Sequence, residues 1–318
     1  MPRPSRWLLG TVFLLGLTPA LRAGGLRVIA SANVTLRQTP SAQAPAVAQL
    51  ALGTEVSETG DADLDKTWTR VVTSTGKTGW VVTRLTLPLD PFWKWQTQER
   101  LIKDRLARVG DGFPASVELV DFVERIADGF TDPDGRARMD LYRLRALQQA
   151  LSAIPFSRIG REPYSSWLAR YKDWTVYSEP GGAWLVENAA IWKVHDARQH
   201  TSAADDLAWL TVSVGLPGEC EGYVPCYLTL RDRLQGEYLR RHPSGAHASE
   251  ALAAVSRTIT SLGDSSAFKT REAFDPKTDC KAFLSSIESL RKAVEVAPRG
   301  QDRDASLANL AALSKRCG

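Results

Sequence analysis

The sequence predicts a multidomain protein in which a small all-β barrel is followed by a mostly α-helical domain. Short strand-like runs separated by turn residues fill residues 26–89. Beyond Pro91, apolar residues recur at the spacing of a helix face over most of the remaining chain. The chain has 318 residues, of which 43% are hydrophobic and 24% charged, so it has the ordinary composition of a globular protein with more than one domain.

Five runs in the first segment have the composition and length of strands. In the fourth run, Trp68 and Val72 fall on one face because successive side chains of a strand alternate. Ser74–Lys77 has the length of a hairpin loop, and Gly76 can adopt the positive φ that such a loop requires. Strands this short favour a closed barrel, since closure removes exposed strand edges. The runs are Val34–Leu36, Ala46–Leu50, Thr54–Glu58, Trp68–Thr73 and Gly79–Thr83.

Four stretches within and around these runs resemble the bacterial SH3 domain, in the order and spacing of that family. Val34–Ser41 resembles the opening of the family's sequence, and Val47–Val56 resembles its middle. Trp68–Val71 and Gly76–Val81 resemble its last two strands. The resemblance implies an SH3-like β-barrel, expected here over residues 26–89, that binds cell-wall peptide or a protein segment.

Two tryptophans and two arginines of this segment are the candidate ligand-binding residues. By the resemblance, Trp68 or Trp80 lines a groove for a peptide or a glycan-linked peptide, for which a rigid aromatic floor is well suited. Packing in the barrel core is the alternative for both tryptophans. Arg37 and Arg70 could contact a ligand carboxylate. Their alternative is a solvated position in which the aliphatic stem covers the barrel wall.

The rest of the chain is expected to form two helical segments. Residues 91–215 form a helical domain with an aromatic-rich irregular stretch, whose rings either line a cleft or fill the core. Residues 216–318 form disulfide-bearing helical hairpins, with breaks at His242–Gly245 and Pro298–Gly300. These hairpins are weakly similar to tetratricopeptide-type helix pairs, although no self-similar repeat is visible. One expected helix face contains Tyr227, Leu230, Leu234 and Tyr238.

Four cysteines in the last third of the chain predict two disulfides, for which several pairings are possible. Cys220 and Cys226 are close enough in sequence to close a tight loop. Cys280 and Cys317 stand at nearly equal distances from the expected turn, so two antiparallel helices that rise ~1.5 Å per residue bring them to one level. This spacing favours the pairs Cys220–Cys226 and Cys280–Cys317. A zinc site is the alternative, but the short cysteine and histidine spacings that it needs are missing.

The N-terminus has the features of a signal peptide over residues 1–23. Arg3 and Arg6 precede the uncharged apolar run Leu8–Leu17, and small residues for cleavage follow it. The run is about half of the ~20 residues that a membrane-spanning helix needs, so a retained anchor is the less favoured alternative. We therefore expect a periplasmic or extracellular protein with no stable membrane span after cleavage. Removal of the peptide takes away three arginines and no acid, which lowers the net charge from +4 to +1 and argues against nucleic-acid binding.

Motifs of known catalytic sites are missing from the sequence. It contains no Gly-x-Ser-x-Gly, no His-Glu-x-x-His and no phosphate-binding glycine loop. His195 adjoins Asp196, but neighbours on a helix point about 100° apart, so we expect exposed residues and no dyad. His242 and His247 flank a turn, which they are expected to cap or to leave solvated. We predict no catalytic residue, no metal and no cofactor.

These observations favour an exported envelope protein that binds or scaffolds without catalysing a reaction. Its expected partner is peptidoglycan, through a cell-wall peptide, or another envelope protein. The alternative is a cell-wall-modifying enzyme with an unrecognised active site in the helical domain.

Overall fold

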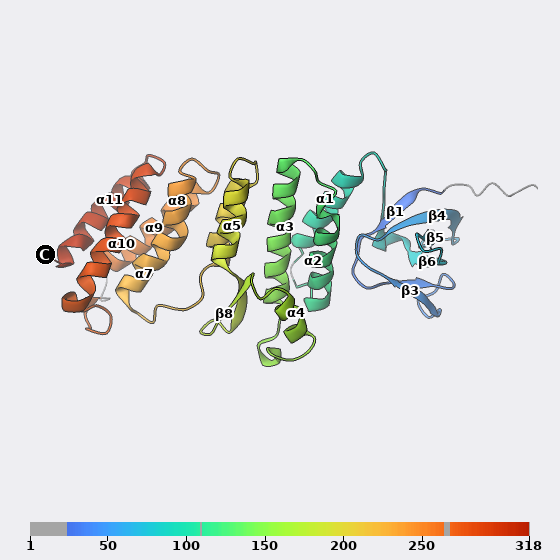
Figure 1. Cartoon of the computed structure of the whole chain (residues 1–318), viewed down its shortest axis with the longest axis horizontal. Helices are drawn as coiled ribbons and strands as arrows, with labels where there is room; N and C mark the ends of the chain where they lie inside the picture. The colour runs from blue at the N-terminus through green and yellow to red at the C-terminus, as the bar shows by residue number, and fades with distance from the viewer. Residues whose placement is uncertain (1–23, 109, 264–267, 318) are drawn as a thin grey trace, which may run out of the picture. The chain divides into compact units, whose positions relative to one another are not determined.

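The computed structural model describes residues 24–108, 110–263 and 268–317 (Figure 1). They form two compact units, one ending at Phe92 and the other beginning at Trp93. The first unit is built of strands and the second mostly of helices, which confirms the predicted fold class. The predicted signal peptide, residues 1–23, lies outside the described residues.

The first unit is one antiparallel sheet in the strand order β3-β2-β6-β5-β4-β1-β7. All five predicted runs are strands, and the sheet also contains β1 and β7, which lie outside the predicted runs. β1 lies between β4 and β7, so it joins the two ends of the module. The strands are β1 (Leu26–Ile29), β2 (Val34–Arg37), β3 (Ala46–Leu50), β4 (Glu55–Ala62), β5 (Trp68–Thr73), β6 (Thr78–Val82) and β7 (Thr86–Pro88), with a 3₁₀ turn at Thr83–Leu85.

Side chains from six strands meet in the core of this unit, which requires the sheet to curl around them as a small barrel. In β5, Val71 is fully buried while its neighbour Arg70 is exposed, as strict alternation requires. The β5–β6 turn closes as predicted: Gly76 has φ 79° and its amide donates to the carbonyl of Thr73 over 2.9 Å. The core residues are Ile29, Val34, Leu36, Leu50, Val56, Val71 and Val81.

In the second unit the helices stand side by side, and a two-stranded ribbon, β8–β9, precedes α5 (Figure 1). Helix α3 is central to the first half, since it packs against α1, α2, α5, α6 and strand β9. The first-half elements are α1 (Lys94–Leu106), α2 (Phe113–Ala127), α3 (Pro133–Ser152), α4 (Tyr164–Arg170), β8 (Thr175–Ser178), β9 (Ala183–Val186), α5 (Asn188–Arg198) and α6 (Ala204–Val214). The second-half helices are α7 (Val224–Arg231), α8 (Glu237–Arg241), α9 (Ala248–Gly263), α10 (Pro276–Val296) and α11 (Gln301–Ser314). Among the described residues, no helix combines the length and the apolar character that a membrane span needs.

A π-helical segment, Asp232–Gly236, separates α7 from α8 and changes which residues face the core. Val224 and Leu228 are buried before it, Leu234 is buried within it, and Tyr238 is buried after it. The predicted stripe is therefore wrong in its first half, where Tyr227 is exposed. A π turn holds more residues per turn than an α-helix, so it rotates the apolar face relative to a regular helix.

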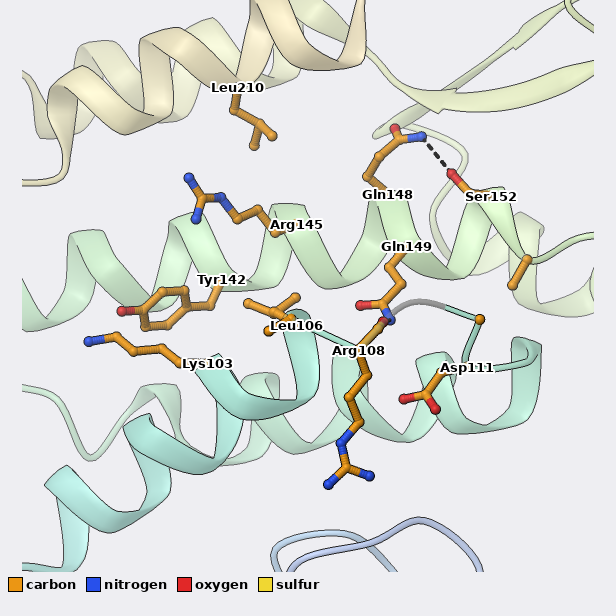
Figure 2. Close-up of a pocket in the computed structure, with 13 residues that line it drawn as sticks. Lys103, Leu106, Arg108, Asp111, Tyr142, Arg145, Gln148, Gln149, Ser152 and Leu210 are labelled. Atoms are coloured by element: carbon orange, nitrogen blue, oxygen red, sulfur yellow. Dashed lines mark hydrogen bonds between the residues drawn. The ribbon is translucent and has the colours of Figure 1, made fainter. Parts of the chain in front are cut away.

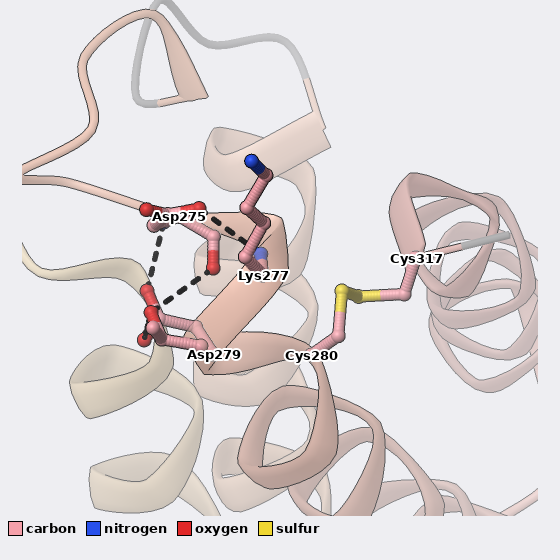
Figure 3. Close-up of a disulfide and its surroundings, with 6 residues drawn as sticks. Asp275, Lys277, Asp279, Cys280 and Cys317 are labelled. Atoms are coloured by element: carbon pink, nitrogen blue, oxygen red, sulfur yellow. Dashed lines mark hydrogen bonds between the residues drawn. A yellow bond between two sulfur atoms is a disulfide. The ribbon is translucent and has the colours of Figure 1, made fainter.

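Both favoured disulfides are present in the second unit. Cys220 and Cys226 have a Cα–Cα separation of 5.4 Å, and Cys280 and Cys317 have one of 5.6 Å. Figure 3 shows the second bridge, which joins the first turns of α10 to the end of the chain beyond α11. The start of α10 is capped beside it: the carboxylate of Asp275 accepts from the amide of Lys277 over 3.0 Å (Figure 3). The turn between the helices falls at residues 297–300, as predicted.

Candidate functional site

Three of the four candidate residues of the barrel form one row across adjacent strands. Trp80 on β6 lies directly opposite Arg70 on β5 and directly opposite Arg37 on β2. Residues directly opposite in an antiparallel ladder have Cβ atoms about 4.5–5.5 Å apart and share a face. The row therefore places Trp80 between two arginine residues on the outer wall of the barrel.

Trp68 stands next to this row on the same wall. It precedes Arg70 by two positions on β5, so both side chains point to the same face, and it lies opposite Val82 on β6. Core packing, the alternative for both tryptophans, is wrong for this structure. The buried residues of these strands are their neighbours in the alternation, such as Val71 and Val81, while both indoles are only partly buried.

The arginines of the row are held by contacts on the barrel. Arg37 donates from Nη1 to the carbonyl of Ala44 over 2.6 Å. Arg70 forms an ion pair of 3.0 Å with Asp61, and the two side chains are 46% and 55% exposed. An ion pair this exposed contributes little to stability, so Asp61 can be exchanged for a ligand carboxylate at low cost.

The acidic loop beside the row has a structural explanation. The carboxylate of Asp63 accepts a hydrogen bond of 2.6 Å from the Thr67 hydroxyl and one of 2.9 Å from the amide of Trp68. These bonds, led by that from Thr67, hold the pKa of Asp63 below its usual value. Asp63 thus shapes the β4–β5 turn and orients the start of the strand that carries Trp68 and Arg70.

The strand order, the curled sheet and its single core define an SH3-like barrel. The particular family follows from comparison: residues 32–86 match the family model for the bacterial SH3 domain, which confirms the resemblance found in the sequence. All four candidate residues fall within the matched segment. A search of curated proteins finds no match to the chain.

In the helical unit, the structure brings together histidines that sequence reasoning kept apart. His195 is 4% exposed, and its Nδ1 lies 2.9 Å from Oδ1 of Asp196. Its Nε2 lies 2.8 Å from Nε2 of His242, which comes from the end of α8. Asp196 is exposed as expected, but the expectation is wrong for His195, which is buried and pairs with the Asp196 carboxylate. Asp196 also pairs with Arg241 over 2.5 Å.

A second set of contacts continues from His242. Its Nδ1 is 3.5 Å from Oδ1 of Asp205, which accepts a hydrogen bond of 2.5 Å from the hydroxyl of Tyr238. The amide of His247 donates to the same hydroxyl over 3.1 Å, and its ring stacks on Trp209 with centroids 4.6 Å apart. We call His195, Asp196, Asp205, Tyr238, His242 and His247 the histidine cluster.

The chemistry of the histidine cluster is that of a fixed network. Both ring nitrogens of His195 are engaged, so neither is available to take a proton from a substrate. The two imidazoles share one Nε2–Nε2 contact, which permits a single proton between them. Burial, together with the neighbouring imidazole, lowers the pKa of His242. The sequence carries little sign of this cluster, because His195 and His242 are 47 positions apart.

The aromatic-rich stretch does not line one cleft but contributes to several neighbourhoods. Trp167 and Tyr171 are buried and pack with each other, their ring centroids 4.8 Å apart. Tyr177 and Trp184 pair across the β8–β9 ribbon. Trp192 contacts His195 edge to face. The core alternative therefore describes Trp167 and Tyr171, and also Trp192 and Trp209, which pack against the second-half core, while Tyr177 and Trp184 cover the ribbon.

Proposed function

We propose that this is an exported envelope protein whose SH3 domain binds peptidoglycan through its peptide, without catalysing a reaction. The observation that carries the proposal is the row Arg37–Trp80–Arg70, flanked by Trp68, on the outer wall of the barrel. Bacterial SH3 domains commonly bind peptidoglycan, and residues 32–86 match that family.

The row suits a peptide that carries carboxylates. The indoles offer a rigid apolar floor, and rings of this kind bind with little loss of side-chain entropy. A guanidinium on each side of Trp80 can form charge-assisted hydrogen bonds with a carboxylate. Cell-wall peptides present both free carboxylates and small apolar side chains, which match these two parts of the surface.

An extracytoplasmic location fits the two disulfides, since such bridges persist in oxidising compartments. Export through a cleaved leader at residues 1–23 would place the protein in the periplasm or outside the cell. The helical unit would then act as the structural or partner-binding part, and an envelope protein bound through it is a further expected partner.

The absence of catalysis is part of the proposal, and two observations support it. All four cysteines are bridged, so no thiolate nucleophile is present. The buried imidazole of His195 already uses both nitrogens. The histidine cluster is also the one observation that favours the alternative, a cell-wall-modifying enzyme. Incubation of purified peptidoglycan with the protein distinguishes the two, because only the enzyme releases soluble muropeptides, and a His195→Ala change would then abolish the release.

Cosedimentation with purified peptidoglycan sacculi tests the binding site. We expect Trp80→Thr and Arg70→Gln each to weaken retention about tenfold or more, as the loss of a central aromatic contact or of a hydrogen bond to a charged group predicts. Lys77→Gln is the matched control, since it removes the same charge from the tip of the same hairpin. Equal retention of R70Q, W80T and K77Q would show that the row is not the binding surface.

A further inference from the structure

A large cavity of the helical unit lies between α1, α3 and α6. It has a volume of about 730 Å³, which is in the range of small-ligand and peptide sites. Figure 2 shows Leu106 from the end of α1 and Leu210 from α6 on its two sides, with polar side chains of α3 between them. We call this cavity the α3 groove.

The charged residues of the α3 groove leave it positive. Lys103, Arg108 and Arg145 line it, together with a single acid, Asp111. Asp111 is already paired over 2.7 Å with Arg105, whose side chain is 3% exposed. Its charge is therefore offset by a buried partner, so the lining holds three cations and no acid that pairs with them. Lys103 and Arg145 pair instead with acids outside the lining, Glu99 and Asp206.

Arg145 is the cation best placed to receive a ligand. Its nearest acid is Asp206 at 3.7 Å, and the two side chains are 40% and 49% exposed. A long, exposed ion pair is weak, so a ligand carboxylate can replace Asp206. Lys103, by contrast, is held by Glu99 at 3.1 Å and supplies mainly positive potential at one end of the groove (Figure 2).

The uncharged polar residues point to a peptide rather than a simple anion. Gln148 donates to the hydroxyl of Ser152 over 3.2 Å (Figure 2). Gln149 donates from its side-chain nitrogen Nε2 to the carbonyl of Arg108 over 3.3 Å. An amide nitrogen carries two hydrogens, and a peptide carbonyl is an acceptor that fits the second one.

Arg145 and Gln149 lie on one face of α3. Residues 145 and 149 are four positions apart, which corresponds to about one turn and ~6 Å along the helix axis. An extended peptide advances ~3.3–3.6 Å per residue, so a carboxylate side chain and a nearby backbone carbonyl can reach both positions at once. We propose that the α3 groove binds a short acidic peptide, with a carboxylate on Arg145 and a backbone carbonyl on Nε2 of Gln149.

Fluorescence anisotropy of the purified protein with labelled hexapeptides tests this site. The probe alternates glutamate and alanine, and the comparison peptide alternates glutamine and alanine. We expect the acidic peptide to bind at least tenfold more tightly, and Arg145→Gln to remove most of that difference. The matched control is Arg100→Gln, because Arg100 lies on the neighbouring helix α1, pairs with an acid at 3.9 Å and is absent from the groove lining.

A change in the barrel separates this site from the one proposed above. Arg70→Gln should leave binding of the acidic hexapeptide unchanged, whatever it does to sedimentation with sacculi. The proposal is overturned if the two peptides bind equally, if R145Q and R100Q weaken binding alike, or if R70Q abolishes it. Competition by a single-stranded oligonucleotide of equal charge would also overturn it, since that would show general attraction of polyanions.

Discussion

The two disulfides close loops of very different length, and this difference predicts how much each stabilises the helical unit. The sequence separation is 37 for Cys280–Cys317 and 6 for Cys220–Cys226. In the chain-entropy model, a bridge stabilises by restricting the unfolded chain, and the effect grows with the logarithm of the loop length. The relation gives about 4 kcal/mol for the long loop and about 2 kcal/mol for the short one at 25 °C.

Two double variants test this difference, and each replaces both cysteines of one bridge so that no unpaired thiol remains. Cys280→Ser with Cys317→Ser opens the long loop, and Cys220→Ser with Cys226→Ser opens the short one. Urea unfolding followed by circular dichroism at 222 nm measures both, because the helices of the second unit dominate that signal. We expect the long-loop variant to lose about 2 kcal/mol more than the short-loop variant.

Packing between α10 and α11 explains why the long-loop variant should still fold. Leu290 on α10 and Leu310 on α11 are fully buried in the same hydrophobic cluster, as is Phe283 close to the bridge. These contacts survive when the bridge is opened, so the native structure keeps its core. A larger loss in the short-loop variant, or an equal loss in both, would refute the chain-entropy reasoning and assign the effect to native contacts.

Two further predictions concern the two units separately. Protonation of His242 is disfavoured in the folded state, because burial lowers its pKa and a second proton would break its contact with His195. The unfolded state then binds more protons than the folded state. The contribution of His242 to the free energy of unfolding should therefore be complete above pH ~6.5 and should fall as the pH drops below it. His242→Gln should reduce the dependence of that free energy on pH, measured by urea unfolding at several pH values. In the barrel, a Cβ on Gly79 would lie 2.6 Å from the carbonyl oxygen of Arg37 and 2.8 Å from Leu36, so Gly79→Ala should destabilise the SH3 domain, by about 1–3 kcal/mol, and lower its midpoint in tryptophan-monitored unfolding.

The barrel could be read from the sequence because its strands are defined locally. Alternation in Trp68–Thr73 and the glycine of the next turn set the β5–β6 hairpin before any long-range contact is known. β1 and β7 have no such local mark, since each is defined by pairing with a distant strand: Leu26 lies opposite Ser57, and Arg27 opposite Pro88. Sequence reasoning therefore found the candidate row but not the two strands that close the module.

The histidine cluster and the π segment were not predicted from the sequence, for a related reason. A hydrophobic stripe assumes a constant helical period, and the extra residue at Asp232–Gly236 breaks that assumption. The same segment rotates the start of α8, which brings Tyr238 and His242 toward α5 and α6. Neither consequence is visible in the residues themselves, because both depend on how α7 and α8 join.

The candidate sites also differ in how directly the sequence encodes them. The row of Arg37, Trp80 and Arg70 is fixed by strand register, which the buried face of each strand enforces: a slip of one residue would put Trp80 into the barrel core. The α3 groove instead depends on tertiary spacing between three helices, and its polar residues, Gln149 and Arg145, are unremarkable on a helical wheel. A binding role for the row therefore needs only the SH3 domain to fold, whereas a role for the groove needs α1 and α6 to keep their distance from α3. Opening the Cys280–Cys317 bridge, which lies in other helices, should consequently leave both sites intact under native conditions, and loss of either activity in that variant would reveal coupling through the helical core.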